Sequence, residues 1–280
     1  MKVRTIGLMV HPGRDDSLDK AACVLNAFKQ AGIAAAVEPH IKAEIYPDAP
    51  LLDESKWDVM ISLGGDGTFL RSAQYAISRD TPLLGINLGR IGFLTEIEMS
   101  GLFDAVNCLA QGRFDIENRM LMQVTVNDDE PFLALNDAVV SRGTHSRLIT
   151  IDAHISSDRI GRYIADGVIV ATPTGSTGYS LSAGGPVVSP GVPCMIITPI
   201  CAHSLQHRPV VVPDTANVHL HLRCENQEGI RLVVDGQDVR TLQGVDRVAV
   251  SRANKDLRLI RFKEPHFFNL VREKLAQWSA

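Results

Sequence analysis

Long apolar runs are missing from this 280-residue chain. No run approaches the roughly 20 apolar residues that a membrane-spanning helix needs, and the start, MKVRTIGLMVHPGRDD, becomes polar too early for a secretory signal. We therefore predict a cytoplasmic protein that has no membrane partner.

Metal-binding and disulfide patterns are scarce as well. The five cysteines include no CxxC pair, which argues against a thiolate zinc site and a disulfide framework. His203 and His207 are four residues apart, and His219 and His221 would share a strand face, but neither pair has a third ligand at a regular spacing. The sequence predicts no metal site built from protein side chains alone.

Excess positive charge is also lacking, because the formal net charge is -4. Nucleic acid is therefore not an expected partner, and an anionic ligand has to be held by local backbone dipoles and a few basic groups. Neither of the common nucleotide-binding fingerprints, GxxxxGK[ST] and GxGxxG, occurs. With 45% hydrophobic and 21% charged residues, the chain has the composition of a globular protein.

The first hundred residues alternate short apolar runs with helical patterns. Residues 3–10 and 58–63 are each followed by a helical pattern, and a third strand is expected at 82–86. Such βα units build a parallel sheet with crossover helices. We predict an N-terminal α/β domain of the Rossmann-like kind over residues 1–119.

From about Met120 the apolar residues instead alternate along the chain, as they do at 149–155 and at 218–224. Alternation indicates half-buried strands, so residues 120–263 are predicted to form a β-rich domain. Helical spacing returns near the end, and a helix within 264–280 is expected to pack back on the first domain.

A glycine-rich turn, Gly64-Gly65-Asp66-Gly67-Thr68, stands between a predicted strand and a predicted helix. Glycines let the backbone approach a ligand closely, and a helix start offers N–H groups that suit a phosphate. Asp66 would be repelled by that phosphate, so we expect it to accept a proton from a hydroxyl or to help hold a metal. A tight turn with an ordinary aspartate is the alternative, and this segment alone does not decide between the two.

A second segment, DGVIVATPTGSTGYSLSAGGP over residues 166–186, runs from a buried strand into a stretch crowded with hydroxyls and glycines. These groups can hydrogen-bond to sugar and amide groups while a flat ring lies against the backbone. A flexible linker is the alternative, but it would leave Tyr179, Leu181 and Pro186 without a purpose. The segment is predicted to bind a ligand.

Several motifs together resemble the successive sequence blocks of the NAD kinase family, and they occur in the family's order over nearly the whole chain. The motif GGDG alone is shared with lipid kinases, whereas the combination is specific. The motifs are GGDGTFLR at 64–71, GINLGRIGFLTE at 85–96, Asn136-Asp137, the segment 166–186, HSLQHRP at 203–209 and VDGQ at 234–237.

This resemblance implies the transfer of a phosphoryl group from ATP or another donor to the 2′-hydroxyl of the adenosine ribose of NAD, at a site between two domains. It implies that Asp66 is the general base, and that Mg²⁺ arrives with the donor phosphates. A homodimer or homotetramer is also implied. The residues implied to contact NAD are Asp66, Gly67, Arg71, Asn136, Asp137, Arg147, Asp166, Thr177, Gly178, Tyr179, Ser180, Leu181, Ser182 and Gln237.

Two other functions stay open at this point. A lipid or small-alcohol kinase would share the GGDG turn, but it would favour an apolar cleft over the polar segment 172–182. A pyridine-nucleotide sensor without catalytic activity would have little reason to retain Asp66 together with Asn136 and Asp137.

Overall fold

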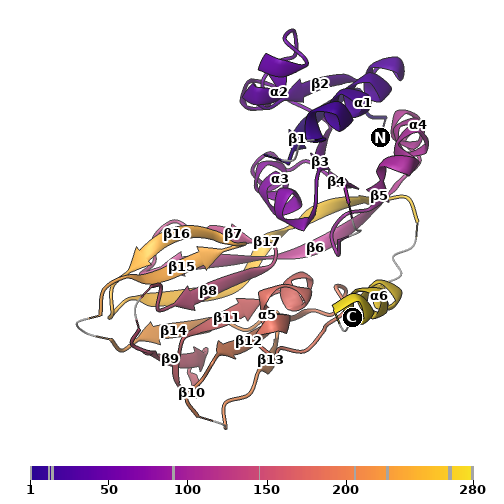
Figure 1. The fold of residues 1–280 in the computed structure, drawn as a ribbon. Helices are drawn as coiled ribbons and strands as arrows, with labels where there is room; N and C mark the ends of the chain where they lie inside the picture. The colour runs from indigo at the N-terminus through magenta and orange to yellow at the C-terminus, as the bar shows by residue number, and fades with distance from the viewer. Residues whose placement is uncertain are drawn as a thin grey trace. The chain divides into compact units, whose positions relative to one another are not determined.

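The computed structural model describes residues 2–11, 13, 16–89, 92–144, 146–204, 206–224, 227–263 and 267–278. The chain forms two compact units, one made of residues 1–118 and 257–280 and the other of residues 119–256 (Figure 1). Among the described residues, no helix is long and apolar enough to cross a membrane.

The first unit contains a parallel sheet in the order β4-β3-β1-β2, formed by Leu83–Asn87, Val59–Leu63, Thr5–Val10 and Ala34–Val37. Strands β1, β3 and β4 are buried almost throughout, as expected for a sheet that helices cover on both faces. The predicted α/β class is therefore confirmed. The unit's other elements are α1 (Ser17–Gln30), α2 (Pro39–Glu44), η1 (Leu52–Glu54), α3 (Asp66–Ser78), β5 (Ile97–Glu98), η2 (Met99–Gly101), α4 (Leu102–Gln111) and α6 (Phe267–Trp278).

Helices α1 and α4 share one hydrophobic core with the sheet. Phe28 of α1 and Leu109 of α4 belong to the same buried cluster as Ile6 and Leu8 of β1. Helix α3 lies against the opposite face, where a Cβ atom on Gly85 of β4 would come within 2.8 Å of the Phe69 ring. Gly85 thus allows α3 to approach the sheet closely.

The second unit is a sandwich of two β-sheets (Figure 1). One sheet has the antiparallel order β13-β12-β11-β8-β15-β16, and the other has the order β10-β9-β14-β17, extended by β6 and β7. The strands are β6 (Asp115–Val126), β7 (Phe132–Ala134), β8 (Asp137–Ser141), β9 (Ile149–Ile155), β10 (Asp158–Ala165), β11 (Gly167–Ala171), β12 (Cys194–Ile200), β13 (Val210–Pro213), β14 (Val218–Leu222), β15 (Ile230–Val234), β16 (Gln237–Leu242) and β17 (Arg247–Arg261).

The alternating residues fill the space between the two sheets. Ile151 of β9, Leu220 of β14 and Val248 of β17 face Val140 of β8 and Val170 of β11 within one buried cluster. The prediction of a β-rich second region is therefore confirmed, and period-two alternation identified the faces that are buried.

The boundary of the second unit differs from the predicted one. Residues 257–263 were expected in the β-rich domain, but they belong to the first unit. Strand β17 continues without a break to Arg261, and Leu259 pairs in parallel with Leu83 of β4. Of the predicted C-terminal helical region, residues 264–266, 279 and 280 lie outside the described part of the chain, and α6 is grouped with the first unit.

Candidate active site

The glycine-rich turn joins the end of β3 to the start of α3, as the sequence predicts. Gly64 follows the last residue of β3, Gly65 caps the helix, and Asp66 is its first residue. A Cβ atom on Gly64 would lie 2.4 Å from the Thr68 hydroxyl oxygen, so a larger residue does not fit there. Gly67 is exposed at the helix start, where the N–H groups of a first turn have no partner within the helix.

Residues 92–94 of the motif GINLGRIGFLTE (residues 85–96) surround the carboxylate of Asp66. The backbone N–H of Phe93 donates to Asp66 Oδ2 at 3.0 Å, and that of Leu94 donates to Oδ1 at 3.2 Å. A Cβ atom on Gly92 would lie only 1.9 Å from Oδ1. The carboxylate is therefore held in one orientation and stays partly exposed, while Arg90 and Ile91 of this motif lie outside the described residues.

Arg71, which was expected to contact a dinucleotide, is engaged within the first unit. It forms an ion pair with Glu38, with 2.8 Å between Nη2 and Oε1. The other oxygen of Glu38 accepts the backbone N–H of Val10 at 2.8 Å. A contact between Arg71 and a ligand would have to be made by the remaining donors of the guanidinium.

In the second unit, Asn136 and Asp137 are held by a carboxylate that the sequence analysis did not select. Asp235 accepts the backbone N–H groups of Leu135 at 2.8 Å, Asn136 at 2.7 Å and Asp137 at 3.2 Å. Asp235 stands in the β15–β16 turn with a positive φ of 48°, followed by Gly236. The pattern Asp-Gly between two alternating runs is the signal that marks such a turn.

Burial controls the protonation of Asp137, whose side chain lies at the start of β8. Burial, and secondarily the nearby Asp235 carboxylate, raise its pKa to about 7. Near neutral pH the group can therefore either donate or accept a hydrogen bond. The Oδ1 atom of Asn136 is buried and has no hydrogen-bond partner among the described residues, which leaves an acceptor for a ligand.

The hydroxyl-rich segment forms two short helical turns, η3 (Thr174–Thr177) and α5 (Tyr179–Ser182), beside Asn136 and Asp137. A Cβ atom on Gly175 would lie 2.0 Å from the Asn136 carbonyl oxygen, which explains a glycine at this position. A Cβ atom on Gly178 would lie 3.6 Å from Asn136 Nδ2 and 3.8 Å from Asp137 Oδ2. The structure thus brings Gly178 close to Asn136 and Asp137, which we call the Asn-Asp pair.

Within this segment some hydroxyls serve the fold and others face outward. Ser180 is buried and shares a 2.9 Å hydrogen bond with Thr198, and Thr177 donates to the Thr174 carbonyl at 3.3 Å. Tyr179 is 47% exposed, Ser182 is exposed and Leu181 is partly buried. Tyr179 and Ser182 therefore offer more surface to a ligand than Ser180 does.

Three predicted residues are not placed against the Asn-Asp pair by any contact. Asp166 pairs with Arg142, with 2.6 Å between Oδ1 and Nε. Arg147 and Gln237 both have exposed side chains, and Gln237 begins β16 opposite Val234. The described residues contain no group of three or more His, Cys, Asp or Glu side chains arranged to hold a metal ion.

Comparisons with known proteins agree on one family. The profile of the ATP-NAD kinase N-terminal domain matches residues 6–114, and that of the ATP-NAD kinase C-terminal domain matches residues 135–262. An NAD kinase of Moorella thermoacetica is 47% identical over 221 residues, covering 78% of this chain and 71% of the relative. An NAD kinase of Caldanaerobacter subterraneus subsp. tengcongensis is 40% identical over 291 residues, covering 98% of this chain and 100% of the relative.

Solved structures share the fold at lower sequence identity. A yeast NADH kinase complexed with NADH matches with a TM-score of 0.90 and 24% identity, covering 98% of this chain and 88% of that one. An NAD kinase from Archaeoglobus fulgidus in complex with ATP matches with a TM-score of 0.76 and 24% identity, covering 97% and 98%.

Proposed function

The chain belongs to the NAD kinase family, and from this we propose that it transfers the γ-phosphoryl group of ATP, or of another phosphoryl donor, to the 2′-hydroxyl of the adenosine ribose of NAD. In this reaction the ribose oxygen forms a bond to phosphorus while the bond to the donor's bridging oxygen breaks. Such a transfer needs an in-line arrangement, a group that takes the hydroxyl proton, and neutralisation of the transferred charge.

The carboxylate of Asp66 is the observation that carries this proposal. It stands at the first turn of α3, and the N–H groups of Phe93 and Leu94 orient both of its oxygens. In the proposed complex this carboxylate would lie close to the donor phosphates, where it can take the proton of the attacking hydroxyl. We assign Asp66 the role of general base, with Gly67 beside the nucleotide.

The Asn-Asp pair supplies hydrogen bonds for the dinucleotide in this proposal. Asn136 Oδ1 would accept a bond from an amide or hydroxyl of the ligand, and Asp137 can donate or accept. Thr177, Gly178, Tyr179 and the rest of the segment through Ser182 would line the same pocket. Asp166 would bind a ribose group, and Arg71, Arg147 and Gln237 would make further contacts.

A divalent ion, Mg²⁺, fits the donor set of the first unit only in part. Asp66 is a single carboxylate, and Mg²⁺ commonly binds one or two carboxylates while the substrate phosphates and waters complete its shell. The ion would neutralise charge on the donor phosphates when bound. Chelation should therefore abolish turnover without lowering the melting temperature.

Assembly and location complete the proposal. We expect a homodimer or homotetramer in the cytoplasm, which uses NAD and the phosphoryl donor as substrates and binds no nucleic acid. Light scattering coupled to size-exclusion chromatography measures the oligomer. A monomeric molecular mass in the active fraction would contradict this part of the proposal.

A coupled assay for NADP formation, run with each phosphoryl donor in turn, tests the activity. NADP formation supports the proposal, whereas phosphorylation of a lipid alcohol alone, or binding of NAD without turnover, would refute it. Asp66→Asn keeps the shape of the side chain but removes the proton acceptor. It should lower kcat by about 10²- to 10⁴-fold with little change in NAD affinity.

Single-turnover rates over a range of Mg²⁺ concentrations separate the possible roles of Asp66. If Asp66 only shapes the turn, Asp66→Asn should stay within about tenfold of the parent, a change of about 1.4 kcal/mol in barrier. If it chiefly holds the ion, added Mg²⁺ should restore much of the rate. Either result would exclude the general base.

A further inference from the structure

The last residue of the motif GINLGRIGFLTE, Glu96, has both of its side-chain oxygens occupied inside the first unit. Its Oε1 accepts the backbone N–H of Phe262 at 2.9 Å, and its Oε2 accepts Arg261 Nη1 at 2.7 Å. The Glu96 side chain is only 13% exposed. It therefore has little capacity to contact a substrate, and its role has to be found in the segment that it holds in place.

Arg261, the last residue of β17, joins Glu96 to a second carboxylate. Its Nε donates to Glu117 Oε2 at 2.6 Å, while its Nη1 donates to Glu96. The side chain of Arg261 is 8% exposed and that of Glu117 is 24% exposed, so solvent screens these pairs less than it screens surface pairs. A guanidinium bridges two carboxylates in a fixed geometry because its N–H donors lie in one rigid plane. Glu96 is therefore held in one position by the end of β17.

The backbone at Glu96 is fixed to a different strand, β4. The N–H of Glu96 donates to the Gly85 carbonyl at 2.9 Å, and β5, which begins directly after Glu96, pairs with β4. Strand β17 also pairs with β4, at Leu259 and Leu83. Glu96 is thus bound to β4 through its backbone and to the end of β17 through its side chain.

This double attachment lies two residues from the N–H groups that orient the proposed general base. The backbone N–H groups of residues 93 and 94 donate to the two oxygens of Asp66. Within the same segment, the Thr95 hydroxyl accepts the backbone N–H of Gly92 at 3.2 Å. Residues 92–96 therefore form a short, internally bonded segment, and a shift of Glu96 would also move the N–H groups that contact Asp66.

We propose that Glu96 and Arg261 are positioning residues for Asp66, which fix the direction of its carboxylate through the N–H groups of residues 93 and 94. The inference rests on the proposed function, in which Asp66 takes the proton of the ribose hydroxyl. A misplacement of about 1 Å, caused by a change outside the reacting groups, can lower a rate about 100-fold. Loss of these positioning residues therefore lowers kcat, while the affinity for NAD stays close to that of the parent.

A purely structural role is the alternative. In that case Arg261 only holds the end of β17 in the first unit, and its loss lowers stability without a particular effect on Asp66. The two roles differ in how substitutions combine. A residue that acts through Asp66 loses its effect on kcat once that carboxylate is gone, whereas a merely destabilising change acts equally with and without it.

Glu96→Gln is the first test variant, because glutamine has one side-chain acceptor oxygen where Glu96 uses two. Either the hydrogen bond from Arg261 or that from Phe262 must be lost. The coupled assay gives kcat and KM for NAD in the parent, Glu96→Gln, Asp66→Asn and the double variant. Arg261→Lys is the second test variant, since lysine keeps the charge but lacks the planar fork that bridges both carboxylates. Melting curves confirm that each variant is folded.

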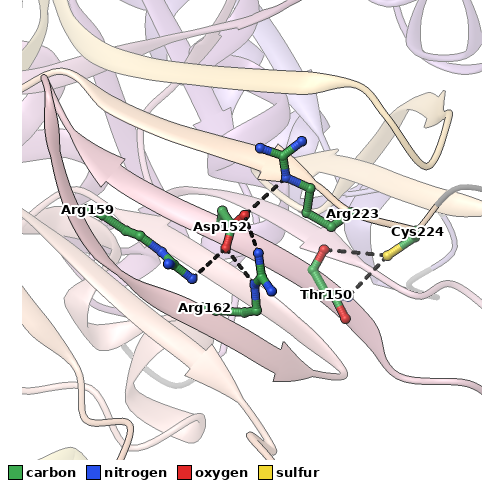
Figure 2. A network of polar contacts seen from close by, with 6 residues as sticks. All are labelled: Thr150, Asp152, Arg159, Arg162, Arg223 and Cys224. Atoms are coloured by element: carbon green, nitrogen blue, oxygen red, sulfur yellow. Dashed lines mark hydrogen bonds and ion pairs between the residues drawn. The ribbon is translucent and has the colours of Figure 1, made fainter.

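The matched control comes from the second unit, where three arginines converge on Asp152 (Figure 2). Asp152 accepts hydrogen bonds from Arg159 Nη2 at 3.0 Å, from Arg162 Nε at 2.8 Å and Nη2 at 3.0 Å, and from Arg223 Nε at 3.0 Å. The hydrogen bond from Arg162 is the largest of the effects that hold the pKa of Asp152 well below its ordinary value. The Asp152 side chain is 6% exposed, so Asp152→Asn also replaces a buried, arginine-paired carboxylate by an amide.

Asp152 is suitable as a control because it faces away from the core of the sandwich. Its neighbours along β9, Ile151 and Ala153, point into that core, and successive side chains of a strand point to opposite faces. Asp152→Asn should therefore lower stability while it keeps the kcat and the KM of the parent.

We expect Glu96→Gln to lower kcat by about tenfold or more, with less than about a twofold change in the KM for NAD. Arg261→Lys should have the same effect to a smaller extent. When Asp66→Asn is already present, adding Glu96→Gln should lower kcat further by less than about twofold.

Hydrogen–deuterium exchange of a peptide that covers residues 92–96 provides a measurement that does not need activity. The N–H groups of residues 93 and 94 should exchange faster in Glu96→Gln than in the parent, because their hydrogen bonds to Asp66 are weakened. In Asp152→Asn they should exchange at the parent's rate. If the parent forms no NADP, the proposed function fails, and exchange still tests the positioning.

Two results would overturn the inference. An equal fold loss of kcat from Glu96→Gln in the presence and in the absence of the Asp66 carboxylate would make the contact merely structural. Exchange at residues 92–96 that matches the parent in both Glu96→Gln and Arg261→Lys would show that this contact does not hold the segment.

Discussion

Asp137 and Asp152 are both buried aspartates of the second unit, yet their surroundings shift their pKa values in opposite directions. Asp152 is surrounded by three arginines and stays ionised, whereas burial, and secondarily the nearby Asp235 carboxylate, raise the pKa of Asp137 to about 7. A buried charge is tolerated where cations and hydrogen bonds compensate for its lost hydration. Perturbed groups without such compensation cluster at functional sites, which agrees with the role proposed for Asp137.

The largest expected difference between the two aspartates lies in the pH dependence of stability. The folded-state pKa of Asp137 is raised above its unfolded value, so its contribution is present below about pH 4 and is lost as the pH rises through about 7. Asp137→Asn should therefore gain stability relative to the parent over this range, by up to about 1.4 kcal/mol per pH unit. Urea unfolding at several pH values measures this gain, and a pH-independent difference would contradict the raised pKa.

For Asp152 the sign is reversed. Its lowered pKa means that its contribution is present above about pH 4 and is lost as the pH falls further. At neutral pH, Asp152→Asn should lower the free energy of unfolding by about 2 kcal/mol, because charge-assisted hydrogen bonds to three arginines are lost. An unfolding free energy equal to that of the parent would show that the cluster contributes nothing to stability.

The next largest difference between Asp137 and Asp152 is expected in the Kd for NAD. Asp137→Asn should raise the Kd for NAD roughly tenfold, or about 1.4 kcal/mol, because the group would contact the ligand. Asp152→Asn should leave that Kd unchanged, since Asp152 faces away from the core on the other sheet. Calorimetric titration of both variants with NAD makes the comparison, and equal Kd values would remove Asp137 from the site.

The smallest effect on the free energy of unfolding is expected for the ion pair of Asp166, which is more exposed than Asp137 and Asp152. Its ion pair with Arg142 is about 30% exposed on both sides, so solvent screens the attraction. Arg142→Gln should lower the free energy of unfolding by less than about 1 kcal/mol, measured by urea unfolding at neutral pH. A loss as large as that of Asp152→Asn would mean that burial does not control the strength of these pairs.

Periodicity and glycine placement predicted much of the fold. Apolar runs at 58–63 and 82–86 became β3 and β4, and the glycines after residue 63 marked the turn into α3. Alternation at 149–155 and 218–224 became β9 and β14. These features are local, so they can be recognised from sequence spacing.

Long-range contacts could not be predicted in the same way. The hydrogen bonds from Phe93 and Leu94 to Asp66 form only because two separate loops lie side by side. The hydrogen bonds that Asp235 accepts from residues 135–137 join positions about a hundred residues apart. Likewise, nothing in the spacing around Arg71 identifies Glu38 as its partner. The extension of β17 to a partner strand in the first unit has the same origin.

Because β17 extends into the first unit, it determines the order in which the two units can be completed during synthesis. Residues 119–256 emerge from the ribosome as one continuous stretch, whereas the first unit must wait for residues 257–263, including Ile260 of its core. Arg261 from this late segment also pairs with Glu96 at 2.7 Å and Glu117 at 2.6 Å. Domains usually fold as units with the N-terminal one first, and here the N-terminal unit is the last to obtain all of its strands.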